Sequence, residues 1–259
     1  MTDDRAPSGE PVLTEDGALV VDGRELCVRI SGRRRRIGLT VERDGSLTLH
    51  VPRGSGVRRV EAFVRSSGLW IEDKTRLGDE RRQLHPVRTL RDGEIHRYLG
   101  RDYRLLFAEG FGEESPAVRL VAGRLRLDGF DANDPAAVRK ALAGWYVRAG
   151  ERWARGRLQP WAARMDVPEA AVRVRDLGHR WGSYRRGAGG EGVVALHWAT
   201  FQLPIHLVDY VIAHELAHAR VSGHGPDYWR LLSRALPECR RLKGELDELG
   251  RRVWMGDLA

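Results

Sequence analysis

A short histidine-rich segment near residue 214 constrains the chain more than any other feature of its sequence. His214 and His218 stand four positions apart, with Glu215 between them, in a segment that has helical apolar periodicity after Pro204. Side chains four positions apart project from one face of a helix, so two imidazole nitrogens can reach one metal ion. The spacing predicts a helix that supplies two ligands to a single zinc ion.

The residues after His218 offer what a catalytic zinc site still needs, which is a third protein ligand and an open fourth position. Gly223 has the backbone freedom to end the helix and turn the chain, and His224 follows at once. Glu215 cannot easily bind an ion held by its own turn, but it can accept a proton from water whose pKa zinc lowers to about 7. We therefore expect a zinc-dependent hydrolase with Glu215 as the general base. The expected zinc ligands are His214, His218 and His224.

The first half of the chain alternates between strand and helix patterns. Apolar alternation at residues 26–30, 37–41 and 47–51 predicts antiparallel strands joined by hairpins. Helical spacing over residues 56–82 predicts a helix that covers this sheet. Strand patterns between residues 94 and 127 predict further strands of the same sheet system.

The composition of successive segments suggests a tail and two domains. Residues 1–11 are polar with two prolines and are expected to be a disordered tail. Residues 12–130 are expected to form an N-terminal β-rich domain. The pattern changes near Asp131, where Asp134 and Pro135 open a long amphipathic segment that should begin the second domain, residues 131–259.

Charge and apolar content argue against several classes of protein. The formal net charge is +8, but the arginines are scattered, and the run Arg33–Arg36 has no interleaved aromatic residues, so specific nucleic-acid binding is not expected. No stretch approaches the roughly 18 apolar residues of a membrane span, and the N-terminus lacks the features of a signal peptide. We expect no membrane association and a cytoplasmic protein.

Further motifs surround the histidine segment. They are Arg180-Trp181-Gly182-Ser183, Leu203-Pro204, Asp209-Tyr210-Val211, the segment His214–His218, and His224 followed by Tyr228-Trp229. With these motifs the chain resembles the YgjP-like zinc metallopeptidases, which are related to the SprT-like and WLM metalloproteases. The resemblance covers roughly residues 25–254 and implies a peptidase that uses Zn²⁺ and acts on a protein or peptide. It also implies the same three zinc ligands and a catalytic Glu215.

The chain departs from the family's pattern at two positions, and both bear on how a substrate is held. Tyr184 stands where the family usually has cysteine, and His197 stands where it usually has asparagine. His197 could approach the zinc or an oxyanion, although a lone histidine on a strand is more often structural.

Two other residues are candidates for binding substrate. The guanidinium of Arg180 could hold a carboxylate or a phosphate through two hydrogen bonds. Trp181 could line the substrate site or simply anchor the core.

The expected fold is α+β. An N-terminal antiparallel β region packs on a helix, and a zincin-like C-terminal half places the His214–His218 helix beside a small sheet. Two other functions remain open. The same scaffold could hydrolyse nucleotides, because zinc-activated water also attacks phosphorus, or the chain could be a basic DNA-binding protein with a structural zinc.

Overall fold

The structure is a computed structural model that describes residues 11–42, 45–109, 117–187 and 189–259. The contacts divide the chain into two units, Met1–Gln83 and Leu84–Ala259, and each is considered by itself. The described residues form three small sheets and six α-helices, which confirms a mixed α+β fold. Apart from Pro11, the tail expected at residues 1–11 lies outside the described residues.

The first unit contains a four-stranded sheet. Its strands are β1 (Gly17–Val21), β2 (Arg24–Ser31), β3 (Gly38–Val41) and β4 (Leu47–Pro52), in the order β1-β2-β4-β3. The expectation of antiparallel hairpins is wrong for the central pair, because β2 and β4 are parallel. The reason is that β4, with the buried Leu47, Leu49 and Val51, takes the central place and β3 pairs only with its far side.

Two helices stand where the sequence pattern predicted one. They are α1 (Val57–Ser66) and α2 (Gly68–Leu84). The break falls at Ser67, whose hydroxyl and backbone N–H both donate to the carbonyl oxygen of Phe63. Val60 and Val64 lie one turn apart on α1 and pack into the core of the sheet.

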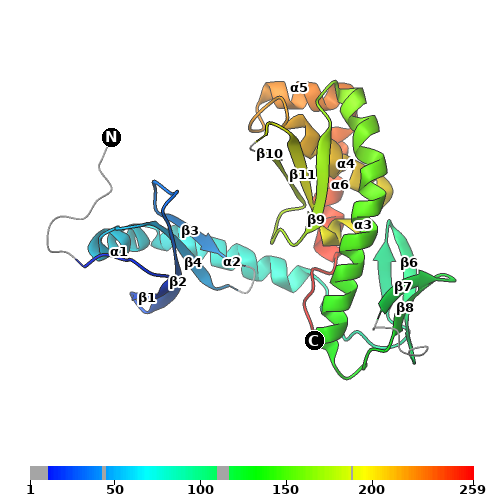
Figure 1. Cartoon of the computed structure of the whole chain (residues 1–259), viewed down its shortest axis with the longest axis horizontal. Coiled ribbons are helices and arrows are strands. Elements are labelled where there is room, and N and C mark those ends of the chain that lie inside the picture. Colours follow the sequence, from blue (N-terminus) through cyan, green and yellow to red (C-terminus); the bar gives the residue numbers. More distant parts are fainter. Residues whose placement is uncertain (1–10, 43–44, 110–116, 188) are drawn as a thin grey trace. The chain divides into compact units, whose positions relative to one another are not determined.

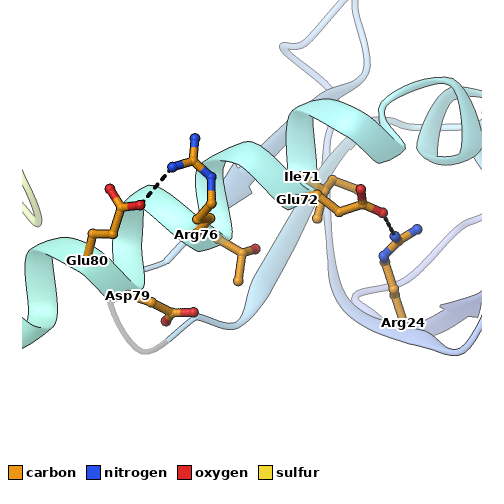
Figure 2. Close-up of a pocket in the computed structure, with 7 residues that line it drawn as sticks. Arg24, Ile71, Glu72, Arg76, Asp79 and Glu80 are labelled. Carbon is orange, nitrogen blue, oxygen red and sulfur yellow. Dashed lines mark hydrogen bonds and ion pairs between the residues drawn. The ribbon is translucent and has the colours of Figure 1, made fainter.

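The outer surface of α2 carries charges that pair with one another. Arg24 of β2 donates to Glu72 at 2.7 Å, and Arg76 donates to Glu80 at 2.7 Å (Figure 2). These side chains line an open hollow of about 540 Å³. Exposed ion pairs contribute about 1 kcal/mol at most, so these pairs add little to the stability of the unit.

The second unit begins with a sheet of its own. The strands are β5 (Ile95–Tyr98), β6 (Arg101–Ala108), β7 (Ala117–Val121) and β8 (Arg124–Asp128), in the order β5-β6-β8-β7. The sequence pattern predicted that these strands extend the first sheet. This prediction is wrong, because they form a separate sheet.

The long helix α3 (Pro135–Met165) explains why this sheet belongs to the second unit. Leu105 and Leu127 of the sheet share one buried core with Val138 and Leu142 of α3. The chain accordingly divides between Gln83 and Leu84, whereas the sequence analysis placed the boundary between residues 130 and 131. The helix begins as its capping signal predicted, with the Asp134 carboxylate accepting the Ala137 N–H at 3.0 Å.

A three-stranded sheet and a group of helices complete the second unit. The strands are β9 (Ala170–Arg175), β10 (Gly182–Arg186) and β11 (Gly192–His197), in the order β10-β11-β9. The remaining elements are η1 (Trp198–Gln202), α4 (Ile205–Ala217), α5 (Pro226–Ala235), α6 (Cys239–Leu249) and η2 (Gly250–Arg252). Figure 1 shows this sheet beside α3; α4 contacts β10 and β11, and α6 contacts α4. None of the described helices is long and apolar enough to span a membrane.

His96 on β5 is a buried histidine with an unusual environment. It is only 1% exposed, its ring meets Trp254 edge-on at 5.2 Å, and neither ring nitrogen has a hydrogen-bond partner among the described residues. Burial, and secondarily the charge of Arg88, lowers the pKa of His96 to about 4. The folded state therefore keeps this imidazole neutral under conditions in which an unfolded chain would protonate it.

We predict that His96 makes the second unit sensitive to acid. As the pH falls from 6.5 towards 4, unfolded chains bind a proton at this histidine and folded chains do not, so the free energy of unfolding drops, by about 3 kcal/mol in full. Urea unfolding followed by tryptophan fluorescence at several pH values should show a shallower loss for His96→Phe than for the wild type. Parallel pH profiles for the two proteins would contradict this prediction.

Candidate metal centre

Helix α4 carries two of the three expected ligands and is buried along most of its length. Five of its apolar side chains are at most 2% exposed: Leu207, Val208, Val211, Ile212 and Leu216. The helix ends at Ala217, with His218 as its C-cap residue, and not at Gly223 as expected. The end comes early because the N–H groups of His218, Ala219 and Arg220 each bond to a carbonyl oxygen three residues back, which tightens the last turn. Gly223 lies in the following loop with φ of +77°.

Three imidazoles converge at the end of this helix. One nitrogen each from His214, His218 and His224 lies within 4.8 Å of the others. Nε2 of His214 and Nε2 of His224 are 3.0 Å apart. The loop that contains Gly223 thus brings His224 back to the helix, as the sequence predicted.

The hydrogen bonds of His218 leave one ring nitrogen available to a metal. Its Nδ1 lies 3.0 Å from the carbonyl oxygen of Val221. A carbonyl oxygen can only accept, so Nδ1 carries the proton and Nε2 keeps its lone pair. A set of three imidazole nitrogens suits a divalent transition metal such as zinc, and the residues present therefore fit a metal ion.

Burial favours the neutral form of two of the clustered histidines, His214 and His224. The pKa of His214 is lowered to about 4 by burial first and then by the neighbouring His218 and His224. Burial and His218 also lower the pKa of His224. Neutral imidazoles retain the lone pairs that a metal requires, so this environment favours metal binding near neutral pH.

Tyr228 of α5 contacts all three imidazoles, which the sequence did not predict. Its ring centroid lies 5.3 Å from that of His214, 4.9 Å from that of His218 and 4.7 Å from that of His224. The side chain is fully buried, and its hydroxyl donates to the carbonyl oxygen of His214 at 3.1 Å. The sequence marks Tyr228 only as part of the motif that follows His224. The available signal in the sequence is that Tyr228 follows His224 by only four residues.

Glu215 points towards the edge strand β10. It is 7% exposed, and a Cβ atom added at Gly182 would lie 2.6 Å from its Oε1 atom. Burial raises the pKa of Glu215 to about 7, while the charge of Arg180 and the backbone N–H of Tyr184 act in the opposite direction. A carboxyl group with a pKa near 7 can both accept and release a proton at neutral pH.

A cavity of about 470 Å³ joins the histidines and Glu215 to the surface. Arg180 and Trp181 line it, together with Gly182, Ser183 and Tyr184 of β10. Helix α6 also lines the cavity, through Lys243, Leu246 and Asp247. Tyr210 of α4 is a further lining residue. The sequence did not predict that any of these four residues lines the cavity. The sequence offers no signal for α6, because its contribution depends on how distant helices pack.

His197 is in a different environment from Arg180 and Trp181. It is fully buried and does not belong to the described lining of the cavity. Its Nδ1 accepts the Ala199 N–H at 3.0 Å at the start of η1, and its Nε2 lies 3.2 Å from a carboxylate oxygen of Asp176. These contacts give His197 a structural role in the turn after β11.

Comparison with known proteins bears directly on the identity of this centre. A family model described as YgjP-like, metallopeptidase domain, matches residues 35–249. This chain belongs to the YgjP-like metallopeptidase family. No curated protein matches the sequence. Among solved structures, the crystal structure of the metallopeptidase zymogen of Pyrococcus abyssi abylysin is similar over 40% of this chain and 98% of that chain, with 21% identity and a TM-score of 0.34.

We predict that this YgjP-like chain binds one divalent metal ion through the three histidines. Elemental analysis after zinc loading and desalting should give about one ion per wild-type chain and far less for His218→Ala, which lacks one ligand. His206→Ala is a matched control, because His206 is an exposed histidine on the same helix that pairs with Glu245. Equal metal content in His218→Ala and His206→Ala would refute the assignment.

Proposed function

We propose that the chain is a zinc-dependent peptidase in which Glu215 is the general base. The observation that carries the proposal is the position of this buried carboxyl group in the same cavity as His214, His218 and His224. Membership in a metallopeptidase family supports peptide hydrolysis as the reaction. Three imidazole ligands support zinc as the metal.

The histidines and Glu215 have different roles in the proposed reaction. A zinc ion held by the three imidazoles would polarise a carbonyl group and make bound water more acidic. Glu215 accepts the proton of the attacking water and then delivers it to the nitrogen of the leaving amine. Its buried position and raised pKa make both transfers accessible at neutral pH.

The position of β10 supports an extended peptide as the substrate. This strand lies at the edge of its sheet, in the order β10-β11-β9, and Gly182, Ser183 and Tyr184 line the cavity. The backbone groups on the free side of an edge strand can pair with an added strand. A substrate bound in this way would pass its backbone alongside Glu215.

The first test compares the wild type with Glu215→Gln on an unstructured protein such as casein. We expect the zinc-loaded wild type to cleave it and the variant to lose about 10²–10⁴-fold in kcat/KM, the usual contribution of a general acid–base group. The variant should keep its metal, because Glu215 is not one of the clustered ligands. Nucleoside triphosphates are assayed in parallel. Their hydrolysis without cleavage of casein would favour the nucleotide phosphohydrolase instead.

A second test uses the close approach of β10 to the base. In Gly182→Ala the new methyl group would lie 2.6 Å from Oε1 and Cγ of Glu215, so the carboxyl group must move. We expect at least a roughly tenfold loss of kcat, because a displaced base transfers protons poorly, with unchanged metal content. Gly156→Ala on α3 is the matched control, since a Cβ atom there meets no atom within 4 Å. Equal activity of the two variants would show that Glu215 does not act from this position.

A further inference from the structure

Arg180 stands out among the charged side chains of the cavity. The lining contains two cationic side chains, Arg180 and Lys243, and two carboxylates, Glu215 and Asp247. Lys243 donates to Asp247 one helical turn away on α6, so those two charges offset each other. The Arg180 guanidinium has neither a hydrogen bond nor an ion pair in the described parts of the chain, although its charge acts on Glu215 in the same cavity.

The backbone around Arg180 is held firmly even though its side chain is exposed. Its own N–H donates to the carbonyl oxygen of Leu177. The carbonyl oxygen of the next residue, Trp181, accepts hydrogen bonds from the backbone N–H of His197 at 2.8 Å and from the Thr200 hydroxyl at 3.2 Å. The Trp181 ring packs closely against Gly250. The guanidinium is therefore tethered at the cavity from a fixed point.

A guanidinium that has no hydrogen-bond partner among the described residues and is anchored at a cavity can bind a planar anion. Guanidinium groups bind carboxylates through two parallel hydrogen bonds, and such charge-assisted bonds are stronger than neutral ones. The lining also contains aromatic and aliphatic side chains, among them Trp181, Tyr210 and Leu246, beside histidines and a serine. Apolar side chains strengthen an ion pair where they keep water away from it.

From this arrangement we infer that Arg180 selects substrates that carry a carboxylate close to the bond that is cleaved. The inference rests on the proposed peptidase function and specifies its substrate class. The carboxylate can belong to an Asp or Glu side chain or to the C-terminus of the peptide. Either source presents the same group to the guanidinium, and the two are separated by experiment.

The experiment uses fluorescein-labelled octapeptides taken from casein in matched forms. One pair differs by Glu or Gln at an internal position, and the other pair by a free acid or an amide at the C-terminus. Affinity is measured by fluorescence anisotropy with zinc-loaded Glu215→Gln, which separates binding from cleavage. Rates of cleavage are measured with proteins that retain Glu215.

We expect the acidic member of at least one pair to bind about tenfold more tightly than its neutral partner, the gain typical of one charge-assisted interaction. The pair that shows the preference identifies the source of the carboxylate. Adding Arg180→Gln should abolish the preference, and Arg180→Lys should retain only part of it, because lysine keeps the charge but not the planar fork.

Arg124→Gln is the matched control for the loss of one positive charge. Arg124 is an exposed residue of β8 in the same unit and is outside the described lining of the cavity, so its removal should leave the preference intact. Lys243→Gln tests the other cation of the cavity. A preference that survives Arg180→Gln and disappears in Lys243→Gln would overturn the assignment to Arg180.

The outcomes also separate this inference from the proposed function. Equal binding of acidic and neutral peptides would overturn the inference, whether or not the wild type cleaves peptides. A carboxylate preference in binding that depends on Arg180, without cleavage by the wild type, would support the carboxylate site and contradict the peptidase.

Discussion

The burial of α4 is the constraint on which the rest of the site depends. Ten of its 13 residues are buried, and α3, α5, α6 and the strands β10 and β11 all pack against it. A rotation of this helix by one residue would move its side chains by about 100° and carry an imidazole into an apolar core. The core therefore fixes the direction in which His214 and Glu215 point. Asp209 adds to this, because its buried carboxylate is held by the Arg157 guanidinium of α3 through two nitrogens.

The same burial sets the chemistry of the groups that reach the cavity. Removing water disfavours charge, so the pKa of His214 falls and the pKa of Glu215 rises. Both residues are thereby kept nearer their neutral forms. The neutral imidazole is the form that binds a metal, and a nearby divalent cation would in turn favour the carboxylate form of Glu215. Burial thus favours the neutral form that a metal ligand needs at His214 and brings the pKa of Glu215, the proposed base, close to neutral pH.

The sequence predicted the parts of the site that local geometry determines. Positions four apart on a helix had to place His214 and His218 together, and Gly223 marked the loop that returns His224. Alternation of apolar residues located the strands, but it carries no information about which strands pair or in which direction. The parallel pairing of β2 with β4 and the separate sheet of the second unit were therefore missed. The wall formed by α6 was missed for the same reason, since it arises from the packing of elements distant in sequence.

The segment Trp181–Tyr184 shows how glycines connect the distant elements of the site. Trp181 fills the space beside Gly250 of η2, Glu215 of α4 fills the space beside Gly182, and Tyr184 fills the space beside Gly192 of β11. In each pair a Cβ atom on the glycine would come within 3 Å of the larger side chain, so each contact depends on the missing side chain. The stretch therefore contacts α4, η2 and β11 at once. These contacts fix the backbone next to Arg180 and so the point from which its side chain extends. The sequence analysis noted that Tyr184 stands where the resembled family usually has cysteine. The larger tyrosine side chain fits here because Gly192 leaves space beside it.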